Sequence, residues 1–248
     1  MKQAKGIIER VRSVNDDYQH LELALEKDDM PRLKPGQSLL ARIQEGWQPY
    51  LREHWWPVGF SGERVVIERP ADQVYTPGQV ADVLGPVGQP FKFRRTLRNV
   101  LLLAYDTPPT PLLMTIPWLL GNRVGVSLVL LGSATTYSGR HIPPEVEIIH
   151  GDEDANWPDQ VMTVGFADQV FVAAAQDDEI ARFRHIYERF QERRAIIPQN
   201  YLFGVFQPSL ICGAGGCNAC TLRMRNQGMQ LVCSTGPAFD LTQVHAIS

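Results

Sequence analysis

Cysteine is scarce in this sequence and is confined to one place. The chain has 248 residues and four cysteines, which are Cys212, Cys217, Cys220 and Cys233. No residue before Cys212 carries a thiol, so the sequence excludes a disulfide framework distributed through the chain. The concentration of thiols in one window instead indicates a local site that needs all four.

Long apolar runs and clusters of basic residues are also missing. The longest apolar stretches, 99–105 and 124–131, are too short to span a bilayer. The N-terminal residues lack the unbroken apolar core of a signal peptide. The net charge is −3 and the basic residues are scattered, which argues against a nucleic-acid-binding surface. We therefore expect a soluble cytoplasmic protein that contacts neither nucleic acid nor membrane.

Motifs of common hydrolases and nucleotide-binding enzymes are absent as well. The chain contains no G-x-S-x-G, H-E-x-x-H or Walker sequence. Six histidines, at positions 20, 54, 141, 150, 185 and 245, show no metal-ligand spacing, and we expect ordinary surface or core roles for them. Acidic residues at 151–159 lack the alternation of a calcium loop, which indicates a solvated loop.

The first part of the chain predicts short antiparallel strands. In residues 18–25, leucines alternate with polar or small residues, as a half-buried strand requires. Further strand-like segments lie at 35–43, 63–70 and 78–88, separated by turn residues. This spacing predicts a small antiparallel β-barrel over residues 1–95.

Residues 96–205 change to an alternation of strands and helices. Apolar runs predict strands buried on both faces at 99–106, 124–132, 145–151 and 168–176. The clearest helix spans 177–195, with an apolar stripe formed by Ile180, Phe183, Ile186, Tyr187 and Phe190. This order predicts a parallel α/β domain, followed by a small cysteine domain over residues 206–248.

Two connecting segments of this region have weaker patterns. Residues 110–122 predict a helix that Pro117 kinks or shortens. Residues 132–139, which follow a predicted strand, indicate a flexible loop.

The spacing of the cysteines is typical of an iron–sulfur site. Cys212, Cys217 and Cys220 match the C-x4-C-x2-C run of plant-type [2Fe–2S] proteins, and Cys233 supplies a fourth thiolate. The glycines between the first two cysteines allow a loop to wrap closely around a cluster, with amides pointing at the sulfurs. Residues 221–232 predict a hairpin that returns Cys233 to the others.

Two other uses of these thiols stay open. A structural zinc site built from four thiolates usually shows two C-x2-C pairs, and this segment contains one. Unrelated buried thiols would be spread through the chain. The single C-x2-C pair argues against zinc, and the confinement of the thiols to one window argues against unrelated buried thiols. Both observations favour a [2Fe–2S] cluster, with zinc as the nearest alternative.

This segment resembles a known family. The letters CGAGGCNAC and CSTGPAFD, in residues 212–240, are similar to the patterns C-G-x-G-x-C-x-x-C and C-x-x-G-P-x-F. These patterns are found in the electron-transfer subunit of type B dihydroorotate dehydrogenase, a member of the ferredoxin–NADP reductase superfamily. The resemblance implies an FAD-binding barrel, a nucleotide-binding α/β domain and a cluster domain. It also implies that a flavoprotein catalytic subunit is the partner.

The flavin motif of that family is altered here. The family segment R-P-[IVF]-S-[IVL] corresponds to residues 56–60, where tryptophan replaces the arginine and glycine replaces the serine. A cation for the pyrophosphate and a hydroxyl for the flavin ring are therefore missing. The candidate flavin contacts that remain in this stretch are Trp56, Pro57, Val58 and Gly59.

The nicotinamide motifs are altered too. The family's glycine-rich loop corresponds to Ala104, Tyr105, Asp106 and Pro108, where Asp106 would place a negative charge among the phosphates. Its C-G-P segment corresponds to residues 174–176, which are Ala-Ala-Gln. These changes predict loss of NAD(P) binding, with retention of FAD left open.

The leading hypothesis is an iron–sulfur electron-transfer subunit that exchanges electrons with a flavoprotein partner. One alternative is an intact FAD- and NADH-dependent reductase subunit. The other is a non-catalytic iron–sulfur scaffold or redox sensor.

Overall fold

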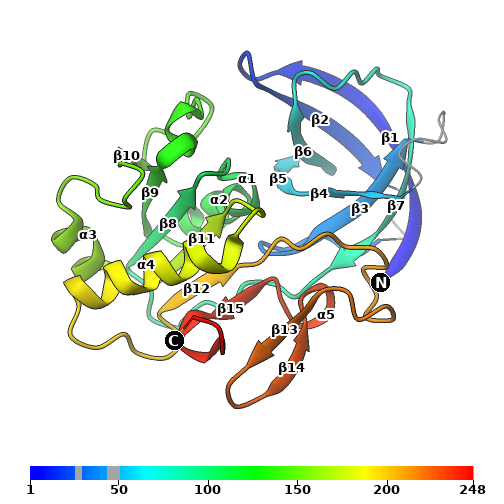
Figure 1. Ribbon diagram of the computed structural model, residues 1–248. Helices are drawn as coiled ribbons and strands as arrows, with labels where there is room; N and C mark the ends of the chain where they lie inside the picture. Colours follow the sequence, from blue (N-terminus) through cyan, green and yellow to red (C-terminus); the bar gives the residue numbers. More distant parts are fainter. Residues whose placement is uncertain (26–29, 44–50, 248) are drawn as a thin grey trace.

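Two large sheets, one curled and antiparallel and one mainly parallel, form the body of the protein (Figure 1). The structure is a computed structural model that describes residues 1–25, 30–43 and 51–247. The curled sheet comes from the first part of the chain and the parallel sheet from the second. The mixed fold class predicted from the sequence is therefore confirmed.

The curled sheet has seven strands in the order β4-β3-β7-β1-β2-β6-β5. Its members are β1 (Lys2–Ser13), β2 (Tyr18–Leu25), β3 (Ser38–Ile43), β4 (Glu53–Trp55), β5 (Pro57–Ser61), β6 (Arg64–Pro70) and β7 (Val80–Val87). All its pairings are antiparallel, and the two end strands, β4 and β5, are not paired with each other. The predicted barrel is thus a half-barrel.

The second sheet has the order β10-β9-β8-β11-β12-β15, with its first five strands parallel. These strands are β8 (Asn99–Tyr105), β9 (Gly125–Leu131), β10 (Glu147–His150), β11 (Gln169–Ala174) and β12 (Leu202–Val205). Helices on its faces are α1 (Thr110–Leu113), α2 (Thr115–Gly121), α3 (Gln160–Phe166) and α4 (Glu179–Arg193). β11 is fully buried, as its unbroken apolar run predicts.

The cysteine segment continues from this sheet rather than standing apart from it. It contains β13 (Thr221–Met224), β14 (Gly228–Leu231), α5 (Val232–Thr235), β15 (Ala238–Asp240) and the 3-10 helix η2 (Leu241–Gln243). The predicted hairpin is confirmed as β13–β14. β15 pairs antiparallel with β12, so the last residues extend the α/β sheet.

Two local expectations need correction. Residues 132–136 form the 3-10 helix η1 (Gly132–Thr136), where the sequence indicated a flexible loop. The helix expected over 110–122 is divided at Met114 into α1 and α2. Pro117 explains this break, because proline has no N–H to donate to the carbonyl of Leu113 four residues earlier.

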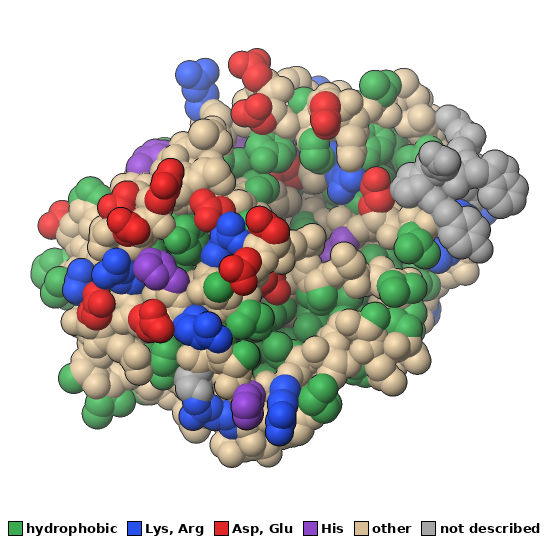
Figure 2. Space-filling view, in the orientation of Figure 1, with side chains coloured by type: hydrophobic (Ala, Val, Ile, Leu, Met, Phe, Trp, Pro, Cys, Tyr) green, Lys and Arg blue, Asp and Glu red, His purple; other side chains and the backbone are tan. Residues whose placement is uncertain are grey.

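Charged and apolar side chains occupy different parts of the surface. In Figure 2, side chains of both signs are interspersed over the region of α4, and hydrophobic side chains gather along the junction of the two sheets. Within the described residues, no helix is both long enough and apolar enough to cross a membrane.

An aromatic stack links the parallel sheet to the connection that precedes it. Phe171 on β11 is fully buried and stacks on Phe91 and Phe203, with ring centroids 4.8 and 5.2 Å apart. Phe93 packs edge-on against the same ring at 5.6 Å. Phe91 and Phe93 lie between the two sheets in sequence, so this stack fixes how the chain passes from one to the other.

Replacing Phe171 with alanine should lower the free energy of unfolding by about 3–5 kcal/mol, because the ring leaves a cavity in a closed stack. Urea denaturation measures this change. Phe166→Ala is the matched control, because that ring is 64% exposed and its loss should cost less than about 0.5 kcal/mol. Equal urea midpoints for the two variants would contradict the structural role of the stack.

Candidate functional site

Three of the four cysteines come from one loop, and the fourth comes from a short helix. Cys212, Cys217 and Cys220 lie between β12 and β13, and Cys233 lies in α5. The hairpin brings the two parts together, since the Val232 N–H donates to the Cys220 carbonyl at 2.9 Å. The Cys233 N–H points at the Cys220 Sγ at 3.5 Å. Local hairpin pairing therefore places Cys233 beside Cys220.

Glycine is required in the cysteine loop at two positions. Gly213 and Gly215 have φ values of +63° and +78°, which side-chain-bearing residues rarely adopt. A Cβ on Gly213 would also lie 2.8 Å from the Leu40 side chain of β3. The tight path turns the Ala214 N–H toward the Cys212 Sγ at 3.4 Å, as the glycine-rich pattern predicted.

The cysteine segment is attached to the curled sheet as well. The Gly88 N–H, directly after β7, donates to the Cys233 carbonyl at 2.9 Å. The Gln89 side chain donates to the Ser234 carbonyl at 2.8 Å. Together with the β12–β15 pairing, these bonds hold the segment against both sheets (Figure 1).

The thiols interact electrostatically. The pKa of Cys212 is lowered to about 6, first by the Ala214 N–H and then by Cys217. Burial raises the pKa of Cys233 to about 12, and Cys220 adds to that increase. Cys220 and Cys233 are 5% and 3% exposed, whereas Cys217 is exposed. One side of the thiol group therefore faces the protein and the other faces solvent.

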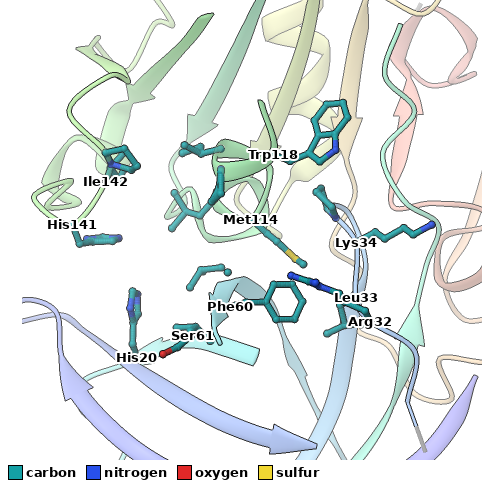
Figure 3. A pocket seen from close by; sticks show the side chains of 18 of the residues that line it. His20, Arg32, Leu33, Lys34, Phe60, Ser61, Met114, Trp118, His141 and Ile142 are labelled. Atoms are coloured by element: carbon teal, nitrogen blue, oxygen red, sulfur yellow. The ribbon is translucent and has the colours of Figure 1, made fainter. Parts of the chain in front are cut away.

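A cavity of about 1000 Å³ lies where the half-barrel meets the α/β unit. One end carries Arg32, Lys34, Phe60 and Trp118, and the other end carries two histidines (Figure 3). The cavity is therefore lined by rings and cations at one end and by imidazoles at the other.

The residues of the altered flavin motif divide between this cavity and the core. Val58 and Gly59, on β5, line the cavity. Trp56 is 8% exposed, and its ring packs on His54 with centroids 4.6 Å apart. Pro57 is buried at the start of β5. Neither of these two is among the residues that line the cavity, and Trp56 belongs to a buried apolar cluster.

The carboxyl ends of β8 and β9, where a dinucleotide would approach in an α/β sheet, hold an internal ion pair. Asp106 follows β8 with a φ of 54° and accepts a hydrogen bond from the Ser133 N–H at 3.0 Å. Its other oxygen pairs with the Arg182 Nε at 3.0 Å. A Cβ on Gly132 would lie 2.1 Å from the Asp106 carboxylate. The Asp106 carboxylate thus uses both of its oxygens in contacts within the chain at this edge of the sheet.

The structure also brings together residues that the sequence analysis set aside. His20 and His141 meet at the buried Glu68, which lies on β6. The Tyr137 and Thr110 hydroxyls donate to this carboxylate at 2.7 and 2.6 Å. Burial raises the pKa of Tyr137 and lowers that of His141. No spacing rule could have found this group, because its members come from distant segments.

Comparison with known proteins identifies the cysteine segment. Residues 207–245, which include all four cysteines, match the model of the iron–sulfur cluster binding domain of dihydroorotate dehydrogenase B. The C-terminal segment is therefore similar to that cluster binding domain. No curated protein matches the chain.

Solved structures share the fold of the whole chain. An NADH-dependent reduced ferredoxin–NADP oxidoreductase superimposes with a TM-score of 0.71 at 15% identity, covering 96% of this chain and 89% of that one. A flavohemoglobin from Malassezia yamatoensis gives 0.59 at 16%, covering 82% and 60%. The ferredoxin reductase of carbazole 1,9a-dioxygenase gives 0.59 at 14%, covering 81% and 68%. The segment similar to the dihydroorotate dehydrogenase B cluster domain therefore lies in a chain with a ferredoxin-reductase-like fold.

In metal-free, reduced protein, iodoacetamide should alkylate Cys212 first at neutral pH. Its rate should rise through about pH 6 and level off above it, because the thiolate is the nucleophile and its pKa is lowered to about 6. Cys233 should react slowly throughout the neutral range, because its pKa is raised to about 12. Mass spectrometry of the peptides gives the rates, and urea-denatured protein is the control. A Cys212 rate that still climbs steeply between pH 7 and 9 would contradict the assignment.

Proposed function

We propose that this chain is an iron–sulfur electron-transfer subunit whose [2Fe–2S] cluster is held by Cys212, Cys217, Cys220 and Cys233. The match of residues 207–245 to the cluster domain of dihydroorotate dehydrogenase B carries this proposal. The C-x4-C-x2-C spacing, with only one C-x2-C pair, supports two irons rather than one zinc.

The surroundings of the thiols suit such a cluster. When bound, the cluster accepts and donates single electrons. Cys220 and Cys233 would hold it from buried positions, and the Ala214 N–H would stabilise negative charge on the Cys212 sulfur. The exposed Cys217 leaves the outer side near solvent, which transfer to another protein requires.

We further propose a flavoprotein catalytic subunit as the partner, docking at the rim of the 213–216 loop. Ile211 and Met229 are 56% and 63% exposed, one directly before the cysteine loop and one on β14. We propose that these two exposed apolar side chains contribute to the surface that contacts the partner. The division into residues 1–95, 96–205 and 206–248 is retained as part of this proposal.

Binding of NAD(P) is not part of the proposed function. The Asp106 carboxylate accepts from the Ser133 N–H and from Arg182, which are groups that a phosphate would otherwise use. A dinucleotide phosphate would have to displace this ion pair and then lie beside a like charge. Electrons would therefore reach the cluster from a partner rather than from a nicotinamide bound to this chain.

A flavin nucleotide in the cavity is a second candidate function, an FAD-containing subunit. The volume of the cavity, about 1000 Å³, is at the upper end of the volumes of ligand sites in proteins, as a dinucleotide requires. Arg12, Arg32 and Lys34 line it and supply the positive charge that the altered motif lacks. Flavin released when the protein is denatured would establish this second candidate function. It would leave the assignment of the cluster unchanged.

Protein purified without air should contain ~2 iron and ~2 sulfide per chain, as a [2Fe–2S] cluster requires. Cys220→Ser should lose most of both, because one buried iron ligand is removed. Ser209→Ala, in the same segment and exposed, is the control and should keep both. Colourless wild-type protein with one zinc would refute the cluster.

Addition of NADH or NADPH alone should leave the visible spectrum of the oxidised protein unchanged, because Asp106 and Arg182 occupy the phosphate position. Dithionite, which needs no binding site, should bleach the cluster and serves as the positive control. The spectrum of the supernatant after denaturation shows whether flavin was bound. Bleaching by NADH within seconds would instead support the intact reductase.

A further inference from the structure

The histidine end of the cavity is built around one buried carboxylate. Glu68 has a side chain with 0% exposure, which is costly for a carboxylate without strong partners. His20 Nε2 lies 3.2 Å from its Oε2 atom, and His141 Nε2 lies 3.7 Å from the same atom. The three ligand atoms all lie within 4.8 Å of one another.

These separations match those of ligands that share one metal ion. With bonds of about 2.1 Å and tetrahedral angles, two ligand atoms lie about 3.4 Å apart. The two distances from Glu68 Oε2, 3.2 and 3.7 Å, lie on either side of that value. Two imidazoles and one carboxylate are a donor set typical of zinc and ferrous iron.

Hydrogen bonds also fix the orientation of the Glu68 carboxylate, as they do for carboxylates that bind metal ions. The Thr110 hydroxyl donates to the Glu68 Oε1 atom at 2.6 Å, which leaves Oε2 directed at the histidines. Tyr137 donates to Oε2 and lies 3.0 Å from the Nε2 of His141. Hydrogen bonds of this kind to a ligating carboxylate are typical of functional metal sites.

The group of His20, Glu68 and His141 is open on the side that faces the cavity. His20 and His141 both line the cavity, and in Figure 3 they lie one above the other at its wall. A metal bound between them would keep at least one position for water or a ligand from the cavity, as catalytic metal sites do. Arg12, in the same wall, adds positive charge that favours an anionic ligand.

We propose that His20, Glu68 and His141 form a binding site for one first-row divalent metal ion, zinc or ferrous iron. The site is separate from the cysteine segment, and none of its ligands is a thiol. The competing arrangement is a closed hydrogen-bond network, in which Tyr137 donates to Glu68 and accepts from His141. The two arrangements differ in one observable, which is whether a metal binds.

Zinc is the probe. The full chain, with its cysteines occupied by iron and sulfide, is dialysed against buffered zinc, and the bound metal is measured by mass spectrometry. Wild-type protein should retain about one zinc per chain beyond the iron, and its melting temperature should rise with zinc concentration. His20→Asn and Glu68→Gln should each weaken zinc binding at least about 100-fold, because each removes a direct ligand.

His185→Asn is the matched control. That imidazole is on α4, outside the cavity lining, and contacts the Asp154 carbonyl at 3.0 Å, so zinc binding should be unchanged. Circular dichroism of each variant establishes that it is folded.

Two results would overturn the proposal. The first is wild-type protein that binds no zinc and whose melting temperature does not respond to it, which would establish the hydrogen-bond network. The second is equal zinc binding by wild type and by folded Glu68→Gln, which would place the metal elsewhere. Iron and sulfide are measured in the same samples, and only samples that keep both are compared, because thiolates that lose iron would bind zinc themselves.

Discussion

The backbone bonds that hold the cysteine segment between the two sheets are the constraint on which the site depends. β15 extends the parallel sheet through β12, and the Gly88 N–H reaches the Cys233 carbonyl from the end of β7. A segment as short as 207–245 cannot bury a large core of its own. Its loop therefore takes its shape from its neighbours, as the closeness of Gly213 to Leu40 demonstrates. This arrangement buries Cys220 and Cys233 and leaves Cys217 at the surface.

Asp106 satisfies polar groups at the carboxyl edge of the parallel sheet from within the chain. In α/β folds, dinucleotides bind outside this edge, where the helices that follow the strands begin with free backbone donors and a positive field. Here Asp106 accepts from the Ser133 N–H and from Arg182. The ion pair is partly exposed, so its direct contribution to stability is small, and its proposed consequence is that NAD(P) does not bind at this edge.

Features set by neighbouring residues could be predicted from the sequence. The apolar run of β11, the stripe of α4 and the cysteine spacing depend on contacts between residues close in the chain, and each was found. The short strands β4 and β5 were missed, because they are strands only through pairing with distant partners. The group of His20, Glu68 and His141 was missed for the same reason. Its first two members are 48 positions apart and no periodicity links them.

The cavity and the cysteine segment pose different physical demands on one chain. The cluster needs thiolates, glycine and backbone amides, and the C-terminal segment supplies them locally. The cavity needs polar groups that converge from both sheets, because no single segment can surround about 1000 Å³. Glu68 from the half-barrel and Thr110 and Tyr137 from the α/β unit meet there, so the polar group at its wall also joins the two sheets. A change in how the sheets meet would therefore alter the cavity, and it would also strain the cysteine segment, which is bonded to β12 and to the end of β7.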